Sequence, residues 1–206
     1  MTTPTPTIEI VCVAYKRYGP LKLLVQSILN QTATNWKLTV YHDGSDEQFD
    51  AVMNSFAHEA PDKISYRSSA IRHNDWGHSL REEGIKHVTS EYLLITNDDN
   101  YYVPPFVQLV TNVIVHDTST DVVMFDMVHS HTNPGRRTLP AYSYFKTTYE
   151  RYSIDIGSAV VRSSLAKQAG FRDKTHDGDA TYFEDILRTK PNLKIHKLNQ
   201  VLFVHN

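Results

Sequence analysis

The sequence of residues 92–104 reads YLLITNDDNYYVP, an apolar run that leads directly into two acids flanked by two amides. A short apolar run bounded by polar residues predicts a buried β-strand. Residues 97–100 then offer four consecutive side-chain oxygens, and such oxygens are the ligands that Mg²⁺, Mn²⁺ and Ca²⁺ prefer. The alternative is a solvated turn, because Asn and Asp also populate turns for backbone reasons. At the carboxyl end of a sheet strand, these residues would face the crevice where α/β folds bind ligands.

Strands and helices alternate on both sides of this stretch. The expected strands lie at residues 8–14, 36–41, 63–67, 92–97 and 121–128. The expected helices lie at residues 20–29, 46–56, 78–88 and 104–113, and Asp46 is the expected N-cap of the second. This alternation predicts an α/β fold with a mostly parallel central sheet and helices on both faces. The strand ends at Ala14, His42, Arg67 and Asn97 should then open towards one edge of the sheet.

The pattern changes after residue 128. Residues 129–137 lack periodicity, which predicts a loop, and a segment rich in aromatic rings follows at residues 142–152. The remaining expected elements are a strand at residues 156–161, a helix at 163–169, a helix that opens at 182, and two short strands at 193–197 and 201–204.

Composition limits the classes of function. A chain of 206 residues with 40% hydrophobic content predicts one domain, residues 8–206, behind a flexible leader at residues 1–7. A net charge of −2 and a pI near 6.6 give no basic field for nucleic acid, and no apolar run is long enough to form a transmembrane segment. The lone Cys12 and the absence of signal-peptide features at the N-terminus predict a cytoplasmic protein.

Glycine-rich phosphate loops are absent from the sequence. Neither G-x-G-x-x-G nor G-x-x-x-x-G-K occurs, so a bound nucleotide would need a metal ion to neutralise its phosphates. The acids Asp98 and Asp99 are suited to hold an ion that stabilises a leaving diphosphate. Asp43, at the end of another expected strand, could accept a hydrogen bond from a pyrimidine imide or a ribose hydroxyl. Its structural alternative is a turn or cap acid.

Three further groups of residues could carry chemistry. Glu184 and Asp185 open an expected helix, where the macrodipole favours anions, but apolar neighbours would place them at a half-buried surface suited to a general base. His205 follows an apolar strand and is either a third metal ligand or a polar terminus. His129 and His131 resemble a zinc pair, but no Cys or third histidine stands at ligand spacing, so no zinc site is expected there.

The order of these pieces resembles one protein family. The pieces are the strand ending in Ala14-Tyr15-Lys16-Arg17, the strand ending in His42-Asp43-Gly44-Ser45, the segment from Trp76-Gly77 to Arg81 and Gly84, Asn97-Asp98-Asp99 with Pro104, Gly157-Ser158 with Gly170-Phe171, and Glu184-Asp185. Taken in this order, they resemble a single-domain GT-A (Rossmann-like) glycosyltransferase of the family 2 type over residues 8–205.

The resemblance implies a metal-dependent, inverting transferase that moves a sugar, expected to be a hexose, from a nucleotide-diphosphate sugar to an acceptor hydroxyl. A UDP-sugar is the expected donor, Mn²⁺ or Mg²⁺ the cofactor, and a glycan or lipid-linked glycan the acceptor. Residues 8–103 would form the nucleotide-binding half and residues 104–206 the acceptor-binding half.

The resemblance also implies roles for individual residues. Asp185 would be the catalytic base, next to Glu184, and Asp43 would read the nucleobase. The other expected donor contacts are Ala14, Tyr15, Arg17, Trp76, Arg81, Asn97 and Asp98. The expected metal ligands are Asp99, Asp98 and His205, of which Asp98 and Asp99 belong to the D-x-D motif. The expected acceptor contacts are Gly157, Ser158, Tyr142 and Tyr144, and rings in this segment could stack on the C–H face of a sugar.

Departures from the family pattern keep two alternatives open. Asn97 replaces the first acid of the D-x-D motif, the segment from Gly77 to Gly84 is one residue short, and the sequence ends at Asn206 without a C-terminal extension. Acceptor recognition is therefore expected from residues 129–156 and the loop around Asp177. A sugar-phosphate nucleotidyltransferase would share the sheet and the acids, and a catalytically inactive nucleotide- or sugar-binding module would tolerate the departures.

Overall fold

The computed structural model describes residues 5–206, so residues 1–4 of the expected leader lie outside the described residues. The helices and strands, in chain order, are β1 (Ile8–Ala14), α1 (Tyr18–Leu29), β2 (Trp36–His42), α2 (Glu47–Glu59), β3 (Ile64–Ser68), α3 (His78–His87), β4 (Tyr92–Asn97), β5 (Tyr101–Tyr102), α4 (Phe106–His116), β6 (Val122–His129), β7 (Ser143–Phe145), β8 (Ala159–Arg162), α5 (Ser163–Ala169), α6 (Gly178–Thr189) and β9 (Ile195–His205). None of the helices among these residues is long and apolar enough to span a membrane.

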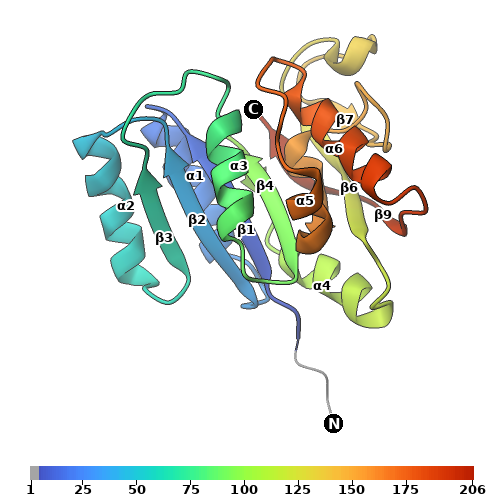
Figure 1. The fold of residues 1–206 in the computed structure, drawn as a ribbon, viewed down its shortest axis with the longest axis horizontal. Coiled ribbons are helices and arrows are strands. Elements are labelled where there is room, and N and C mark those ends of the chain that lie inside the picture. The colour runs from blue at the N-terminus through green and yellow to red at the C-terminus, as the bar shows by residue number, and fades with distance from the viewer. Residues whose placement is uncertain (1–4) are drawn as a thin grey trace.

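The first half of the sheet is parallel, as the alternation of strands and helices predicts. β3, β2, β1 and β4 lie side by side in this order, and all three pairings between them are parallel (Figure 1). Ala14 pairs with His42, and Val13 with Asn97, so these three strands end at the same edge of the sheet. The expected convergence of the polar residues that follow β1, β2 and β4 is confirmed.

The second half of the sheet is mixed. β8 runs antiparallel to both β4 and β6, whereas β9 runs parallel to β6. The expected α/β fold with helices on both faces of the sheet is confirmed. The strands are all parallel only as far as β4, and beyond it parallel and antiparallel pairs are mixed. The two short strands expected at the C-terminus are one strand, β9, which a bulge interrupts opposite Phe125 and Asp126. The strand expected at residues 156–161 begins later, at Ala159, after a short 3₁₀ turn.

Helices cover both faces of the sheet, and each face has its own apolar core. On β1, Ile8, Ile10 and Cys12 pack with residues of α1, α2 and α4. Val11 and Val13 point to the other face and pack with residues of α3, α5 and α6. This period-2 alternation of a strand that is buried along its whole length explains why its sequence is apolar at every position except Glu9. Asp46 caps α2 as expected, because its carboxylate accepts a 2.8 Å hydrogen bond from the backbone N–H of Phe49.

Helix α3 packs closely on the sheet at Gly84. A Cβ atom added there would lie 2.4 Å from Val11 Cγ1 and 3.3 Å from Tyr41 Cε2. The substitution Gly84→Ala is therefore expected to lower the free energy of unfolding by about 1–3 kcal/mol, because overpacking displaces neighbouring groups. Urea unfolding followed by circular dichroism measures this change. Gly19→Ala in α1 is the matched control, since no described atom lies within 4 Å of its added Cβ. Equal losses in both variants would contradict the packing argument.

Candidate active site

A cavity of about 750 Å³ opens at the edge where β1, β2 and β4 end. Its lining residues are Val13, Ala14, Tyr15, Arg17, Asp43, Arg72, Asn74, Trp76, Gly77, His78, Leu80, Arg81, Asn97, His176 and Asp179. The lining includes every donor contact expected from the sequence except Asp98, which lies directly behind Tyr15 and Arg17. The cavity therefore gathers residues from the first half of the sheet and from the start of α6.

Asp43 and Tyr15 are both part of the cavity lining. Asp43 is buried, and its two carboxylate oxygens accept hydrogen bonds of 2.7 and 2.9 Å from the backbone N–H groups of His73 and Asn74. These bonds fix the carboxylate, and each oxygen keeps a lone pair for a ligand. The guanidinium of Arg72 lies 3.9 Å from the centre of the Tyr15 ring. A nucleobase that stacks on this face of Tyr15 would take the place of Arg72.

The loop of residues 72–76, which contributes to the cavity lining, is conformationally strained. Asn74 and Trp76 both have positive φ angles, 53° and 63°, in the left-handed region that residues other than glycine rarely adopt. The side chain of Trp76 is 66% exposed and meets the ring of His176 edge-on. Strain of this kind persists where the surrounding structure holds it, and it is typical of ligand-binding loops.

Arg17 lines the cavity and forms a charge cluster with Asp98 and Asp99. Arg17 Nη2 lies 2.5 Å from Asp98 Oδ1, and Nη1 of the same guanidinium is paired with Asp99. Asp98 also accepts a hydrogen bond from the backbone N–H of Tyr15. Burial raises the pKa of Asp98 to about 6, against the lowering effect of Arg17. One cation thus neutralises two neighbouring acids.

The carboxylates fit a hard divalent cation. Asp99 Oδ1 and His205 Nδ1 are buried and have no hydrogen-bond partner among residues 5–206. The Asn206 side chain donates a 2.8 Å hydrogen bond to the backbone oxygen of Asp99, which holds the end of β9 beside the acids. Carboxylate oxygens together with a histidine nitrogen suit Mn²⁺. In this structure the positive charge that balances the two acids is the guanidinium of Arg17.

A buried arginine, Arg81, links the sheet to the start of α6. Its two terminal nitrogens lie 2.6 Å from the Asn97 amide oxygen and 2.9 Å from Asp179 Oδ1. The ring of His78 adds a third contact to Arg81, at 2.6 Å. Burial raises the pKa of Asp179, although Arg81 acts in the opposite direction. The carboxylate of Asp179 is thus oriented, more basic than an exposed one, and open to the cavity.

Glu184 and Asp185 are not brought to the cavity. Helix α6 begins at Gly178 rather than at residue 182, so both acids lie in its interior rather than at its start. Asp185 pairs with Arg172 at 2.6 Å and with Arg188 at 2.6 Å. Glu184 makes a two-pronged ion pair with Arg151. The acid that α6 presents to the cavity is Asp179.

The acceptor residues expected from the sequence also lie outside the cavity lining. Gly157 and Ser158 form a 3₁₀ turn whose capping box with Asp155 is complete, and an added Cβ at Gly157 would lie 2.8 Å from the Tyr102 hydroxyl. This turn positions Asp155, whose carboxylate lies 3.4 Å from His205 Nε2. Burial alone would raise the pKa of Asp155, but His205 lowers it below the ordinary value. Conversely, Asp155 raises the pKa of His205 against the effect of burial.

Tyr142 and Tyr144 are exposed at the outer edge of the sheet. Tyr142 is 67% exposed, and Tyr144 donates a 2.8 Å hydrogen bond from its hydroxyl to Asp126. Strand β7, which carries Tyr144, pairs with the end of β6 that also carries His129. The two rings are therefore accessible to a ligand, but at a distance along the sheet from the cavity lining.

Comparison with known proteins identifies the family of this chain. A model of the family described as "Glycosyl transferase family 2" matches residues 9–172. The chain belongs to glycosyl transferase family 2. An uncharacterized glycosyltransferase of Rickettsia typhi is 25% identical to this family 2 chain over 123 residues, which are 60% of the chain and 36% of the relative.

Solved structures show the same fold. S. aureus TarS 1-349 matches this family 2 chain with a TM-score of 0.78 at 13% identity, over 97% of the chain and 60% of TarS 1-349. The complex of TarS 1-349 with UDP matches with a TM-score of 0.76 at 15% identity, over 96% and 60%. A mannosyltransferase from Pyrobaculum calidifontis in complex with GDP-Man and Mn²⁺ matches with a TM-score of 0.73 at 15% identity, over 98% and 57%. The chain thus spans about three fifths of these solved chains and a smaller share of the curated relative.

Proposed function

We propose that this family 2 chain transfers a sugar from a UDP-sugar to an acceptor hydroxyl with inversion, with Mn²⁺ or Mg²⁺ bound at Asp98 and Asp99. The observation that carries the proposal is one cavity lined by two oriented acids, Asp43 and Asp179, and by Arg17, which is paired with the acids Asp98 and Asp99. This set offers one group for each part of a donor molecule, the nucleoside, the sugar and the diphosphate.

Asp43 would bind the nucleobase of the donor. A fixed carboxylate accepts a hydrogen bond from an N–H group, and the N3–H of uracil supplies one. The ring of Tyr15 offers a face for the base once Arg72 turns away, because aromatic rings stack on each other. Solved relatives with UDP and with UDP-GlcNAc support this choice of donor.

Asp99, Asp98 and His205 would hold the divalent cation. When bound, the ion supplies positive charge to the diphosphate as it leaves the sugar. With these residues holding the ion, the side chain of Arg17, which is half exposed, would be free to contact a phosphate oxygen. The Mn²⁺ complex of the Pyrobaculum mannosyltransferase supports the choice of ion.

Asp179 would act as the general base, in place of Asp185. Its carboxylate accepts the proton of the acceptor hydroxyl while that oxygen attacks the anomeric carbon and the bond to the diphosphate breaks. Arg81 keeps the carboxylate directed at the cavity, and burial keeps it basic. One displacement without a covalent intermediate inverts the anomeric configuration. Residues 129–156 and the loop around Asp177 would supply the surface for a glycan or lipid-linked glycan, including the exposed rings of Tyr142 and Tyr144.

The proposal is tested by the melting temperature of the protein with UDP, GDP, CDP or TDP, each with and without Mn²⁺. UDP with Mn²⁺ at about 100 times its dissociation constant is expected to stabilise the fold by about 2.7 kcal/mol, which corresponds to an increase of about 5–10 °C. UDP without Mn²⁺ is the control and is expected to give a smaller shift. The absence of any nucleotide-dependent shift would contradict the proposal, and release of pyrophosphate from UTP and a sugar phosphate would favour a nucleotidyltransferase.

A further inference from the structure

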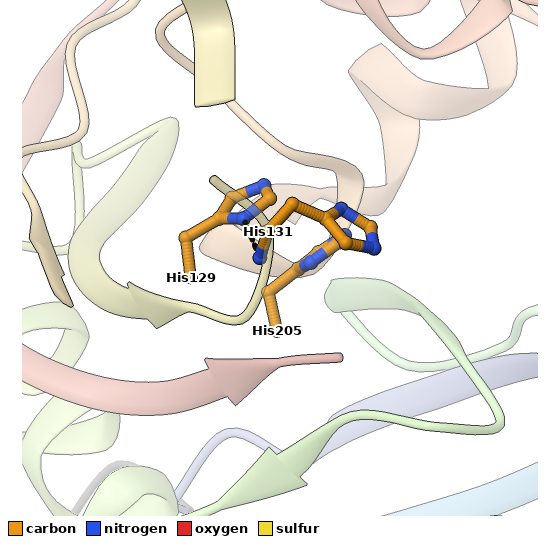
Figure 2. A group of neighbouring side chains, drawn as sticks. All are labelled: His129, His131 and His205. Atoms are coloured by element: carbon orange, nitrogen blue, oxygen red, sulfur yellow. Dashed lines mark hydrogen bonds between the residues drawn. The ribbon is translucent and has the colours of Figure 1, made fainter. Parts of the chain in front are cut away.

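Three histidines that the sequence separates meet at the end of two parallel strands. β6 ends at His129 and β9 ends at His205, and the two residues are directly paired across the strands. Their rings stack with centroids 4.3 Å apart, and His131 lies beside them with its ring centroid 5.2 Å from that of His129 (Figure 2). One nitrogen from each ring lies within 4.8 Å of the other two. The expectation that no third histidine reaches His129 and His131 is wrong, because strand pairing supplies His205.

The ring of His205 is prepared for a metal by its partner Asp155. His205 Nε2 faces the Asp155 carboxylate at 3.4 Å, which places the proton on this nitrogen. The other nitrogen, Nδ1, is left as a lone-pair donor that is buried and has no hydrogen-bond partner in the described chain. A carboxylate that orients a histidine in this way is the usual support behind a metal-binding imidazole.

The site also needs a change in the other two rings, of which His131 is exposed and His129 is half-buried. His129 Nδ1 accepts a 3.1 Å hydrogen bond from the backbone N–H of His131, which a turn of the ring about its side-chain bonds would release. Ligands of a tetrahedral zinc ion lie about 3.4 Å apart, given Zn–N distances of about 2.0–2.1 Å. The nitrogens must therefore approach one another by up to about 1.4 Å, and the ring of His129 must rotate out of the stack so that its lone pair points at the ion, while His205 keeps its contact with Asp155.

We propose that His129, His131 and His205 form a second metal site, selective for borderline ions such as Zn²⁺ or Co²⁺. Imidazole nitrogens suit these ions, whereas the carboxylates of Asp98 and Asp99 suit Mg²⁺ and Mn²⁺. Three histidines leave a fourth position open to water or to a ligand. His205 belongs to both sites, so Zn²⁺ at the histidines competes with the ion at Asp99. This competition rests on the proposed function, whereas the zinc site itself does not.

Direct binding to metal-free protein without a polyhistidine tag tests the proposal. At about pH 8, where imidazoles are neutral, Zn²⁺ is titrated calorimetrically and Co²⁺ by its visible absorption. The wild type is expected to bind one ion, and His131→Ala to weaken binding at least about tenfold. His87→Ala, which removes another exposed histidine, and Asp99→Asn are expected to leave Zn²⁺ binding unchanged.

Two outcomes overturn the zinc site. One is equal Zn²⁺ affinity of the wild type and His131→Ala, and the other is loss of Zn²⁺ binding in Asp99→Asn but not in His131→Ala. His131 is exposed, so its replacement leaves the fold intact, and circular dichroism checks this. Because no sugar nucleotide is present, failure of the transferase proposal does not affect the result.

Discussion

Asp179→Asn is expected to lower the turnover number for sugar transfer by about 10²- to 10⁴-fold, the range over which a positioned general base contributes. The amide has nearly the shape of the carboxylate and still accepts a hydrogen bond from Arg81, so the walls of the cavity should keep their positions. It cannot accept a proton from the acceptor hydroxyl. The loss should therefore fall on turnover, while the affinity for UDP with Mn²⁺ stays within about twofold.

Initial rates of UDP release with a sugar donor and acceptor measure the effect, with Asp185→Asn as the matched control. Asp185 lies on the same helix but is tied to Arg172 and Arg188, so its variant is expected to lose stability and keep its turnover number. The pH profile is a second readout. The base must be ionised, and burial raises the pKa of Asp179, so wild-type activity should fall on the acid side at a higher pH than for an ordinary carboxylate. Full turnover in Asp179→Asn would exclude Asp179 as the base, and loss of turnover in Asp185→Asn would assign the base to Asp185.

The part of the cavity that the first half of the sheet forms could be predicted because its information is local. Each of β1, β2 and β4 is an apolar run that ends in polar residues, and parallel strands bring such ends to one edge. Ala14, Asp43 and Asn97 therefore converge without any knowledge of side-chain contacts. The position of Asp98 and Asp99 follows from the same reasoning, because these residues continue β4.

The acid on α6 could not be predicted in the same way. The apolar face of the helix, with Tyr182, Phe183 and Ile186, is visible in the sequence, but its first turn is polar. Gly178 and Asp179 are fixed instead by long-range contacts with His78 and Arg81, about a hundred residues earlier. Gly178 fits tightly against His78, since an added Cβ would lie 2.7 Å from His78 Nε2. This contact joins residues far apart in the sequence, so no local pattern predicts it.

The histidine cluster was missed for a related reason. His129 and His131 are visible as a pair, but His205 joins them only because β9 pairs in parallel with β6. Parallel pairing between distant strands has no local pattern in the sequence, since the strands need a long connection. The turn at Gly157, for which the sequence predicts an acceptor contact, positions Asp155 beside His205 in the structure, and this contact has no local pattern either.

Asp99→Asn is expected to remove the effect of Mn²⁺ on nucleotide binding. In the wild type, Asp98 and Asp99 would release Arg17 to hold the ion, which would supply positive charge to the diphosphate. With one acid neutral, the remaining charge of Asp98 pairs with Arg17 and leaves no site for a divalent ion. The affinity for UDP in the presence of Mn²⁺ should fall at least about 100-fold, or about 2.7 kcal/mol, towards the value without the ion.

Calorimetric titration of UDP with and without Mn²⁺ measures this loss, and Glu91→Gln is the matched control. Glu91 is an exposed acid paired with Arg162 and lies before β4, at the opposite end of that strand from Asn97, so its replacement removes one carboxylate without touching the cavity. If Asp99→Asn bound UDP as tightly as the wild type with Mn²⁺ present, Arg17 itself would be the cation that serves the diphosphate. That result would make transfer independent of metal, because a guanidinium already paired with Asp98 supplies positive charge at the same place.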